Sequence, residues 1–334
     1  MAISAKDLAK QLGLSPSAVS LALNDRPGVS EATRRRVLDA AKAQGFDFGK
    51  VRPGAGNRGK IAFLRCVRYG AVVSEVPFFR DMEDMVAREC RAHGYCAEVS
   101  RLFPQDDVPR RIEALRRDGA DGIILLGTEL RPEEFAPFRE TDLPVVVLDA
   151  YYESIGLDCV IINNAQGAYT AARALLAARR GQPGYLRSSY PISNFDQRAH
   201  GFYMAIQESG LSPARSIVHR LTPSLDGAYA DMKAVLAAGD QLASCYFADN
   251  DVIALGAARA LREVGLRVTQ DVALIGFENM EWAEQSDPPL TTVSYPQLTA
   301  GRLAAQRLLS RIPADTEERV KIEIQTKLVQ RKSV

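Results

Sequence analysis

The stretch SAKDLAKQLGLSPSAVSLALN, at residues 4–24, predicts two short helices joined by a tight turn. In the first helix, apolar residues recur at helical spacing, at positions 8, 9 and 12. Gly13 is expected to end this helix, because glycine adopts a positive φ without steric cost. Ser15 and Pro16 suit the N-cap and first position of a second helix, since the amide that proline lacks has no helical partner there. The pair has the pattern of a helix-turn-helix, whose second helix enters the DNA major groove.

A third helix is predicted at residues 31–46, EATRRRVLDAAKAQGF, with Val37, Leu38, Ala40 and Ala41 on its inward face. Three helices within about 45 residues can enclose one small core. An ordinary helical hairpin without a nucleic-acid partner is the alternative interpretation, because short motifs also arise by chance.

Charge distinguishes the N-terminal region from the rest of the chain. Residues 1–60 contain 11 Lys and Arg against 5 Asp and Glu, whereas the remainder contains 31 against 36. A basic head on a mildly acidic body is typical of a protein that binds a polyanion. A solvated basic face without a partner is the alternative, but the adjacent helix-turn-helix favours nucleic acid.

Composition limits the classes of protein that remain. A chain of 334 residues is too long for one core and suits two or three domains. It contains no run of about 18 apolar residues and no N-terminal apolar signal segment, so neither a membrane partner nor secretion is expected. Five scattered cysteines fit a reducing compartment better than a disulfide framework. We therefore expect a cytoplasmic protein.

Residues 61–334 alternate strand-like and helix-like segments. The strand-like runs are short and mostly apolar, as buried parallel strands are, and are expected at residues 61–67, 95–100, 122–126, 145–148, 159–162, 184–187, 216–221, 243–247 and 272–275. Helices are expected between them, among others at residues 79–93, 165–180, 197–209 and 251–264. This alternation predicts an α/β fold of doubly wound parallel sheets, and nine strands suggest two lobes.

The sequence resembles the lactose-repressor (LacI/GalR) family of transcription regulators. AKDLAKQLGLSPSAVSLALN and VSEATRRRVLDAAKAQGF carry the likeness near the N-terminus. Shorter matching runs follow in the family's order along nearly the whole chain: PFF at 77–79, DQRAHGF at 196–202, ADND at 248–251, ALG at 254–256, DVALIGFE at 271–278 and PPLTTV at 288–293. The resemblance implies a three-helix head and a two-lobed body similar to periplasmic binding proteins.

The expected domain organisation has three parts. Residues 1–46 form the DNA-binding head, residues 47–60 a linker, and residues 61–334 a body that binds an effector and dimerises. By resemblance, the N-lobe of the body comprises 61–161 and 293–320, and the C-lobe comprises 162–292 and 321–334.

The beginning of the second helix is expected to meet base edges. Ser17 offers a hydrogen bond, whereas Pro16, Ala18 and Leu21 offer apolar contact with thymine methyl groups. The family often has a polar or basic residue in place of Leu21. Contacts to phosphates, which position a protein on DNA, are expected from the basic residues of the third helix and from Ser15, Ser20 and Asn24.

The linker, DFGKVRPGAGNRGK, is rich in glycine and basic residues and shows no helical period. Related repressors usually form a hinge helix here, with a leucine that wedges into the minor groove. This linker lacks such a leucine. Arg52 and Arg58 are expected to enter the minor groove as charges, and a flexible tether is the alternative.

Polar and aromatic residues follow the expected strands, where ligands bind in parallel α/β folds. The predicted effector-contacting residues are Tyr69, Phe78, Phe79, Asp149, Tyr151, Ser188, Arg198, Asn250, Glu278 and Trp282. Such a set suits a sugar-like polyol, because each hydroxyl needs a fixed donor and acceptor and an arginine can hold two oxygens.

By resemblance, Arg198, Asn250 and Glu278 match effector-binding positions of the family, although many relatives have aspartate in place of Glu278. Two alternatives stay open. The phenylalanines at 78 and 79 suit packing at a helix start, and the aspartates at 249 and 251 suit helix capping.

No cofactor, metal or enzymatic activity is expected. The sequence has no nucleotide-binding fingerprint and no evident pairing of a nucleophile with a base. Cys90, His93 and Cys96 have a loosely metal-like spacing, but they lie across a helix end and no fourth ligand is evident.

The sequence therefore predicts a homodimeric transcription regulator, a repressor, that binds double-stranded operator DNA and a sugar-like effector. One alternative is a sugar-binding sensor whose head has lost specific DNA binding, which the unusual linker and Leu21 motivate. A sugar-active or nucleotide-active enzyme is a further alternative, which the absence of a catalytic constellation disfavours.

Overall fold

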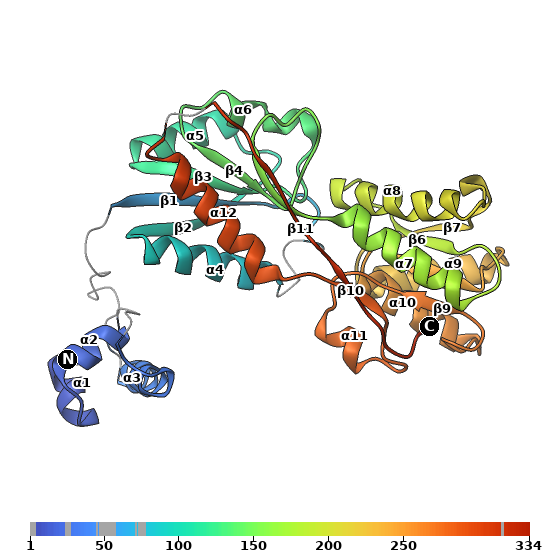
Figure 1. Cartoon of the computed structure of the whole chain (residues 1–334), viewed down its shortest axis with the longest axis horizontal. Helices are drawn as coiled ribbons and strands as arrows, with labels where there is room; N and C mark the ends of the chain where they lie inside the picture. The colour runs from blue at the N-terminus through green and yellow to red at the C-terminus, as the bar shows by residue number, and fades with distance from the viewer. Residues whose placement is uncertain are drawn as a thin grey trace.

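A computed structural model describes residues 5–23, 28–44, 46, 58–70, 72, 78–314 and 317–334. The N-terminal head consists of α1 (Ala5–Leu12), α2 (Pro16–Leu23) and α3 (Glu31–Ala43) (Figure 1). Its core is formed by six buried apolar residues, two from each helix: Leu8, Ala9, Val19, Ala22, Val37 and Ala41. The predicted three-helix head is thus observed.

The first lobe of the body, the N-lobe, is built on a six-stranded parallel sheet. In spatial order its strands are β11 (Lys321–Ile324), β5 (Asp158–Ile162), β4 (Val145–Leu148), β3 (Ala120–Leu126), β1 (Gly59–Cys66) and β2 (Tyr95–Leu102). One face is covered by α4 (Phe78–Ala92) and α12 (Gln297–Arg311), and the other by α5 (Val108–Arg117) and α6 (Ala136–Arg139). Alternate strand residues pack on the two faces, as the doubly wound pattern predicts.

The second lobe, the C-lobe, is built on a four-stranded parallel sheet. In spatial order its strands are β7 (Val218–Leu221), β6 (Gly184–Ser188), β8 (Cys245–Ala248) and β9 (Ala273–Ile275). One face packs against α7 (Asn164–Ala178) and α8 (Ser193–Glu208), and the other against α9 (Leu225–Ala238) and α10 (Asp251–Glu263). A short helix, α11 (Glu281–Gln285), follows β9.

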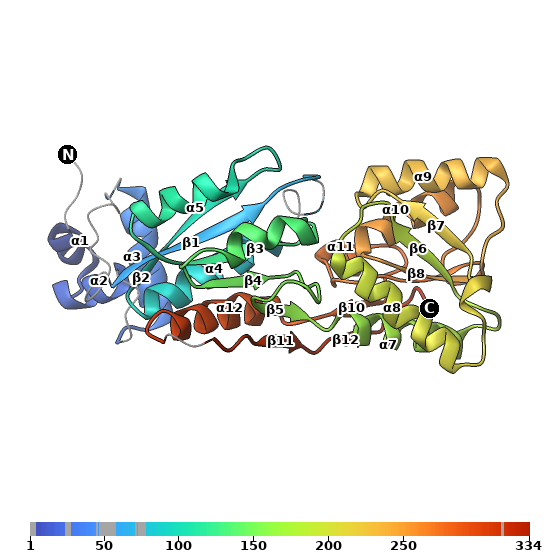
Figure 2. The ribbon, with the colours of Figure 1, turned by 90° about the horizontal axis from the view of Figure 1, so that it is seen from above.

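The chain passes between the lobes three times, and Figure 2 shows these passages side by side. They are the links from β5 to α7, from β10 (Thr292–Ser294) to α12, and from β11 to β12 (Lys327–Val329). Strands β10 and β12 pair antiparallel, which joins two of the passages. The lobes can therefore change their relative angle only by bending this shared hinge.

The predicted α/β fold class is confirmed, and all nine predicted strands are present with ends that differ by at most two residues. The three C-terminal strands, β10 to β12, were not predicted because they are short and β11 alternates exposed and buried residues. The expected assignment of residues 321–324 to the C-lobe is wrong, because β11 pairs with β5 at the edge of the N-lobe sheet. The linker was expected to reach residue 60, but β1 already begins at Gly59.

Among the helices that the structure describes, none combines the length and the apolar character needed to cross a membrane.

Helices α7 and α8 approach closely at Gly201, where an added Cβ atom would lie 2.0 Å from the carbonyl oxygen of Ala165. Alanine normally stabilises an exposed helix relative to glycine by about 1 kcal/mol. We predict the opposite sign for Gly201→Ala, a loss of about 1–3 kcal/mol, because the helices must separate to admit the methyl group. Urea unfolding measures this free energy. Gln207→Ala, on the exposed side of α8, serves as a control; equal or higher stability of Gly201→Ala would contradict the packing.

Candidate functional site

The first turn of α2 presents polar groups to solvent. The Ser15 hydroxyl accepts a hydrogen bond from the Ala18 amide at 3.1 Å, as an N-cap does, and lies 2.9 Å from the Ser17 hydroxyl. Pro16, Ser17 and Ser20 are exposed, whereas Val19 on the opposite face is buried. The predicted contact residues thus share the outward face of a helix whose other face is fixed by the core.

Leu21 and Ala18 are only half-buried on this helix. A Cβ atom added to Gly28 would lie 3.2 Å from a methyl group of Leu21, so this leucine also packs against the segment before α3. Asn24 and Arg52 lie outside the described residues. The Arg58 amide donates to the carbonyl of Gly94 at 2.8 Å, which ties its backbone to the start of the N-lobe sheet.

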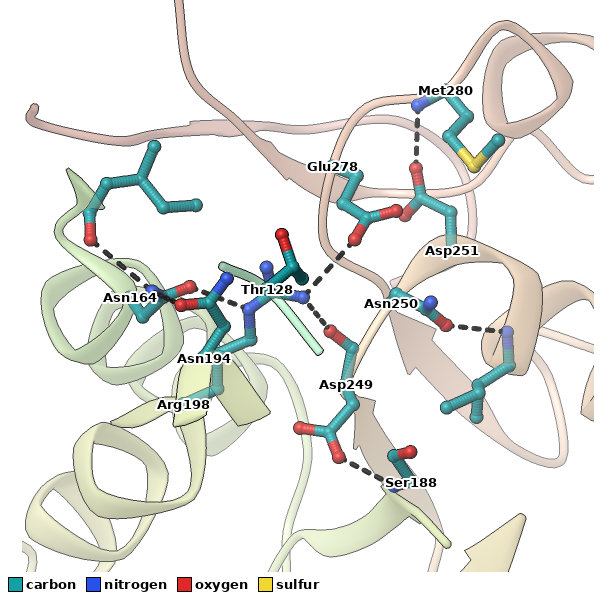
Figure 3. A network of polar contacts seen from close by, with 12 residues as sticks. Thr128, Asn164, Ser188, Asn194, Arg198, Asp249, Asn250, Asp251, Glu278 and Met280 are labelled. Carbon is teal, nitrogen blue, oxygen red and sulfur yellow. Dashed lines mark hydrogen bonds and ion pairs between the residues drawn. The ribbon is translucent and has the colours of Figure 1, made fainter. Parts of the chain in front are cut away.

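The polar centre of the body is Arg198, which α8 holds only 2 % exposed (Figure 3). Its Nε donates to the Asn164 side chain at 2.9 Å, and its Nη1 donates to the carbonyl of Asp249. The same Nη1 lies 3.5 Å from a carboxylate oxygen of Glu278. Phe277 stacks beneath the guanidinium, 3.8 Å from ring centroid to Cζ. Removing a guanidinium cation from water costs free energy, and the hydrogen bonds, the nearby carboxyl group and the stacked ring offset that cost.

Asn194 joins the two lobes through this centre. It lies one helical turn before Arg198 on α8, and its amide donates to the carbonyl and the carboxylate of Asp149 at 3.1 and 3.0 Å. Asp149 follows β4 of the N-lobe and also accepts a hydrogen bond from Thr128 at 2.7 Å. A second contact across the lobes is the stack of Tyr69 on Tyr190, whose ring centroids are 4.4 Å apart.

The residues after β8 and β9 complete the C-lobe side. Asn250 is the N-cap of α10 and accepts from the Ile253 amide at 3.0 Å. The Asp251 carboxylate accepts hydrogen bonds from the Met280 amide and the Thr292 hydroxyl. These bonds fix the position of the loop after β9. Glu278 in that loop has a φ of 111°, a conformation that residues with a side chain rarely adopt. Such strain is typical of positions that a functional site holds in place.

Burial makes the carboxyl groups of this centre hard to ionise. It raises the pKa of Glu278 to about 8, against the opposing charge of Arg198. It likewise raises the pKa of Asp149 to about 6, although Thr128 and Asn194 stabilise the ionised form. With one guanidinium and two carboxyl groups from opposite lobes, the centre can donate to and accept from neutral oxygen atoms.

Several predicted residues lie apart from Arg198. The side chain of Phe78 is outside the described residues, and Phe79 packs in the core beside α12. Tyr151 donates its hydroxyl hydrogen bond to Glu153 and lines a cavity that does not include Arg198. Trp282 is 48 % exposed on α11.

Sequence reasoning missed Thr128 and Asn164. They follow β3 and β5, so the rule that directs attention to strand ends could have found them. Asn194 was expected among the polar residues that follow the strand at 184–187, although it was not included among the predicted effector contacts. Helix α8 begins at Ser193 and not near residue 197 as expected. Ser188, which was predicted, contributes its backbone amide to Asp249 at 2.6 Å.

The cysteine and histidine residues with metal-like spacing lie in different surroundings. Cys90 is buried in the core, and the His93 ring bonds to the carbonyl of Glu89. Over the described ranges, no group of three potential metal ligands was found.

The N-terminal head and the C-terminal half of the body each match a known protein family. Residues 4–47 match the family described as bacterial regulatory proteins, lacI family, and residues 172–334 match a periplasmic binding protein-like domain. The HTH-type transcriptional repressor PurR of Edwardsiella ictaluri is 30% identical over 336 residues, which covers 98% of this chain and 96% of that protein. The HTH-type transcriptional regulator GalS of Salmonella typhimurium is 30% identical over 310 residues, covering 92% and 89%.

Among solved structures, the fold is similar to that of the transcriptional regulator CelR in complex with cellobiose. The TM-score is 0.73 at 24% sequence identity, and the match covers 99% of this chain and 100% of that one. This likeness concerns the fold of the head and of both lobes.

The raised pKa of Glu278 predicts how stability depends on pH. Between its unfolded value of 4.5 and about 8, the folded state holds a proton that the unfolded state has lost, so stability falls as pH rises through this window. Glutamine does not titrate, so the variant Glu278→Gln should not show this fall in stability. Its stability relative to the wild type should increase across the window, by up to about 1.4 kcal/mol per pH unit.

Urea unfolding at several pH values tests this dependence. Glu281→Gln changes an exposed carboxylate nearby and should leave the pH dependence of the wild type unaltered. If Glu278→Gln and the wild type lost stability in parallel, the raised pKa would be contradicted.

Proposed function

The chain belongs to the lacI family of bacterial regulatory proteins and is a DNA-binding transcription regulator, and we propose that it is a repressor controlled by a small uncharged polyol bound between its lobes. The observation that carries this proposal is the buried centre at Arg198, in which Asn194 joins the C-lobe to Asp149 of the N-lobe.

The chemistry of the centre favours an uncharged ligand. Asp149 and Glu278 present carboxyl groups from opposite lobes, and Arg198 is the cation between them. A phosphate or carboxylate ligand would find a single cation here, and that guanidinium already bonds Asn164 and Asp249 and lies beside Glu278. Hydroxyl groups can instead exchange hydrogen bonds with the carboxyl groups in either protonation state, and can accept from the arginine and from the amides of Asn164 and Asn194.

Control of DNA binding requires that the ligand prefer one lobe arrangement. A ligand that replaces the contact between Asn194 and Asp149 acts directly on the angle between the lobes. In a homodimer, this angle sets the separation of two heads that must fit half-sites about 34 Å apart. We therefore propose a homodimer that acts in the cytoplasm on operator DNA of two-fold symmetry.

In the head, we propose that Pro16, Ser17, Ala18 and Leu21 contact bases and that Ser15, Ser20 and Asn24 contact phosphates. The exposed first turn of α2 supports these roles. A sensor that has lost specific DNA binding gains no support, because the lacI-family match falls on the head itself.

We also propose that the chain has no enzymatic activity. The relatives named above are transcription regulators. Among the described residues, the side chains and backbone groups bonded to Arg198 include no histidine that could serve as a base.

Selection of duplexes from a random DNA pool, at about 150 mM salt where binding to phosphates alone is weak, should yield a palindromic site. Ser17→Ala removes one hydrogen bond per head and should weaken binding to that site about fivefold or more, since such a bond is worth about 1 kcal/mol. The exposed Ser244→Ala, in the C-lobe, should bind as the wild type does. Recovery of no common motif would contradict the proposed operator binding.

Arg198→Lys keeps the charge but loses the planar fork, and it should weaken polyol binding about 10–100-fold. Calorimetric titration with neutral sugars, each beside its phosphorylated form, measures this affinity. Arg187→Lys is the matched control, because Arg187 pairs instead with the exposed Asp196. Tighter binding of a phosphorylated sugar than of its parent would overturn the proposed ligand class.

A further inference from the structure

Two consecutive residues in the loop after β9 have positive φ values, 111° at Glu278 and 57° at Asn279. Asparagine tolerates the left-handed region, but a glutamate at 111° adopts its conformation only at a cost in free energy. The Glu278 amide donates to the carbonyl of Val293 at 2.8 Å, and the Met280 amide donates to Asp251 at 2.8 Å. These bonds hold the backbone of the loop, whereas the side chain of Asn279 is held by another part of the chain.

The partner of the Asn279 side chain is Arg331, which follows β12. The Arg331 Nη2 donates to the side-chain oxygen of Asn279 at 2.7 Å, and its Nη1 donates to the carbonyl of Leu290 at 2.8 Å. The Arg331 side chain is 14 % exposed and also pairs with the exposed Glu284 at 3.7 Å. The planar fork therefore ties the strained loop to residue 290, and a lysine, with a single nitrogen, cannot reproduce this geometry.

The backbone around Arg331 is itself fixed to the C-lobe. The Arg331 amide donates to the Thr291 hydroxyl at 2.9 Å, and the Ser333 hydroxyl donates to the carbonyl of Leu274 on β9 at 2.6 Å. The Leu274 amide donates in return to the carbonyl of Ser333, which is fully buried. Residues 331–333 therefore run beside β9 (Figure 1) and support the guanidinium that reaches the loop after this strand.

We propose that Arg331 is a positioning residue of the effector site. Through Asn279 it holds Glu278 in the strained conformation, which keeps a carboxylate oxygen 3.5 Å from Nη1 of Arg198. Without the bond from Arg331, the loop can relax to ordinary negative φ values, and the carboxyl group then turns away from this nitrogen. The importance of this placement for ligand binding rests on the polyol site proposed above, whereas the placement itself is testable without a ligand.

The ionisation of Glu278 reports where its carboxyl group lies, because burial in the centre raises its pKa to about 8. Stability therefore falls as pH rises from 4.5 to about 8 when a buried Glu278 is present, and Glu278→Gln should not show this fall. The groups that face this carboxyl group from other elements are Asp149, Arg198, Asp251 and Tyr295. They are common to both members of each pair compared below, so their own titration cancels to first order.

The experiment compares the urea midpoints of the full-length protein with and without Glu278→Gln, in the wild-type and the Arg331→Lys backgrounds, at about pH 5 and about pH 8. In the wild-type background, the midpoint of Glu278→Gln should rise relative to its parent between the two pH values. In the Arg331→Lys background, this relative rise should shrink to about half or less, because a relaxed Glu278 is closer to water and ionises at lower pH. A merely structural role of Arg331 would lower both midpoints equally and leave the rise unchanged.

Arg307→Lys is the matched control, because the Arg307 side chain is 18 % exposed and pairs with the buried Asp158 in the N-lobe. This change should destabilise the protein without altering the relative rise. Glu284→Gln, which removes the exposed ion pair of Arg331, should leave the rise unchanged as well. An undiminished rise in the Arg331→Lys background would overturn the proposal. A wild-type background without any rise would overturn it too, since Glu278 would then not be held in the buried centre.

Discussion

The burial of one guanidinium organises the body of this protein. Arg198 is almost completely buried, so protein atoms rather than water must stabilise its positive charge. Those atoms come from the start of α7, the end of β8 and the loop after β9. Each of these segments lies where a parallel strand ends, and the arginine thereby gathers the ends of β5, β8 and β9 around one point.

The same helix also carries the contact between the lobes. Asn194 bonds to Asp149 one turn before Arg198, so a ligand at the arginine acts on the interlobe contact without any long-range relay. The stacked rings of Tyr69 and Tyr190 add an apolar contact across the lobes. Three chain passages through the hinge then leave the lobe angle as the simplest motion that ligand binding can bias.

Much of this architecture was predictable because buried parallel strands are apolar runs and their ends are marked by polar residues. Arg198, Glu278 and Asp149 were predicted in this way and lie together. Tyr151 was predicted with them but lines a cavity that does not include Arg198; Asp149, two residues before it, adopts a φ of 59°. The edge strand β11 was missed since its one well-buried residue gives no apolar run.

The central claim is that a polyol at Arg198 and operator DNA at the head are linked through the lobe angle. Thermodynamic linkage tests it most directly: the operator affinity is measured with and without the polyol, and the polyol affinity with and without the operator. The account predicts that both affinities change by the same factor, of about ten or more, as reciprocity requires. A factor of one in both experiments, with each ligand bound normally, would contradict it.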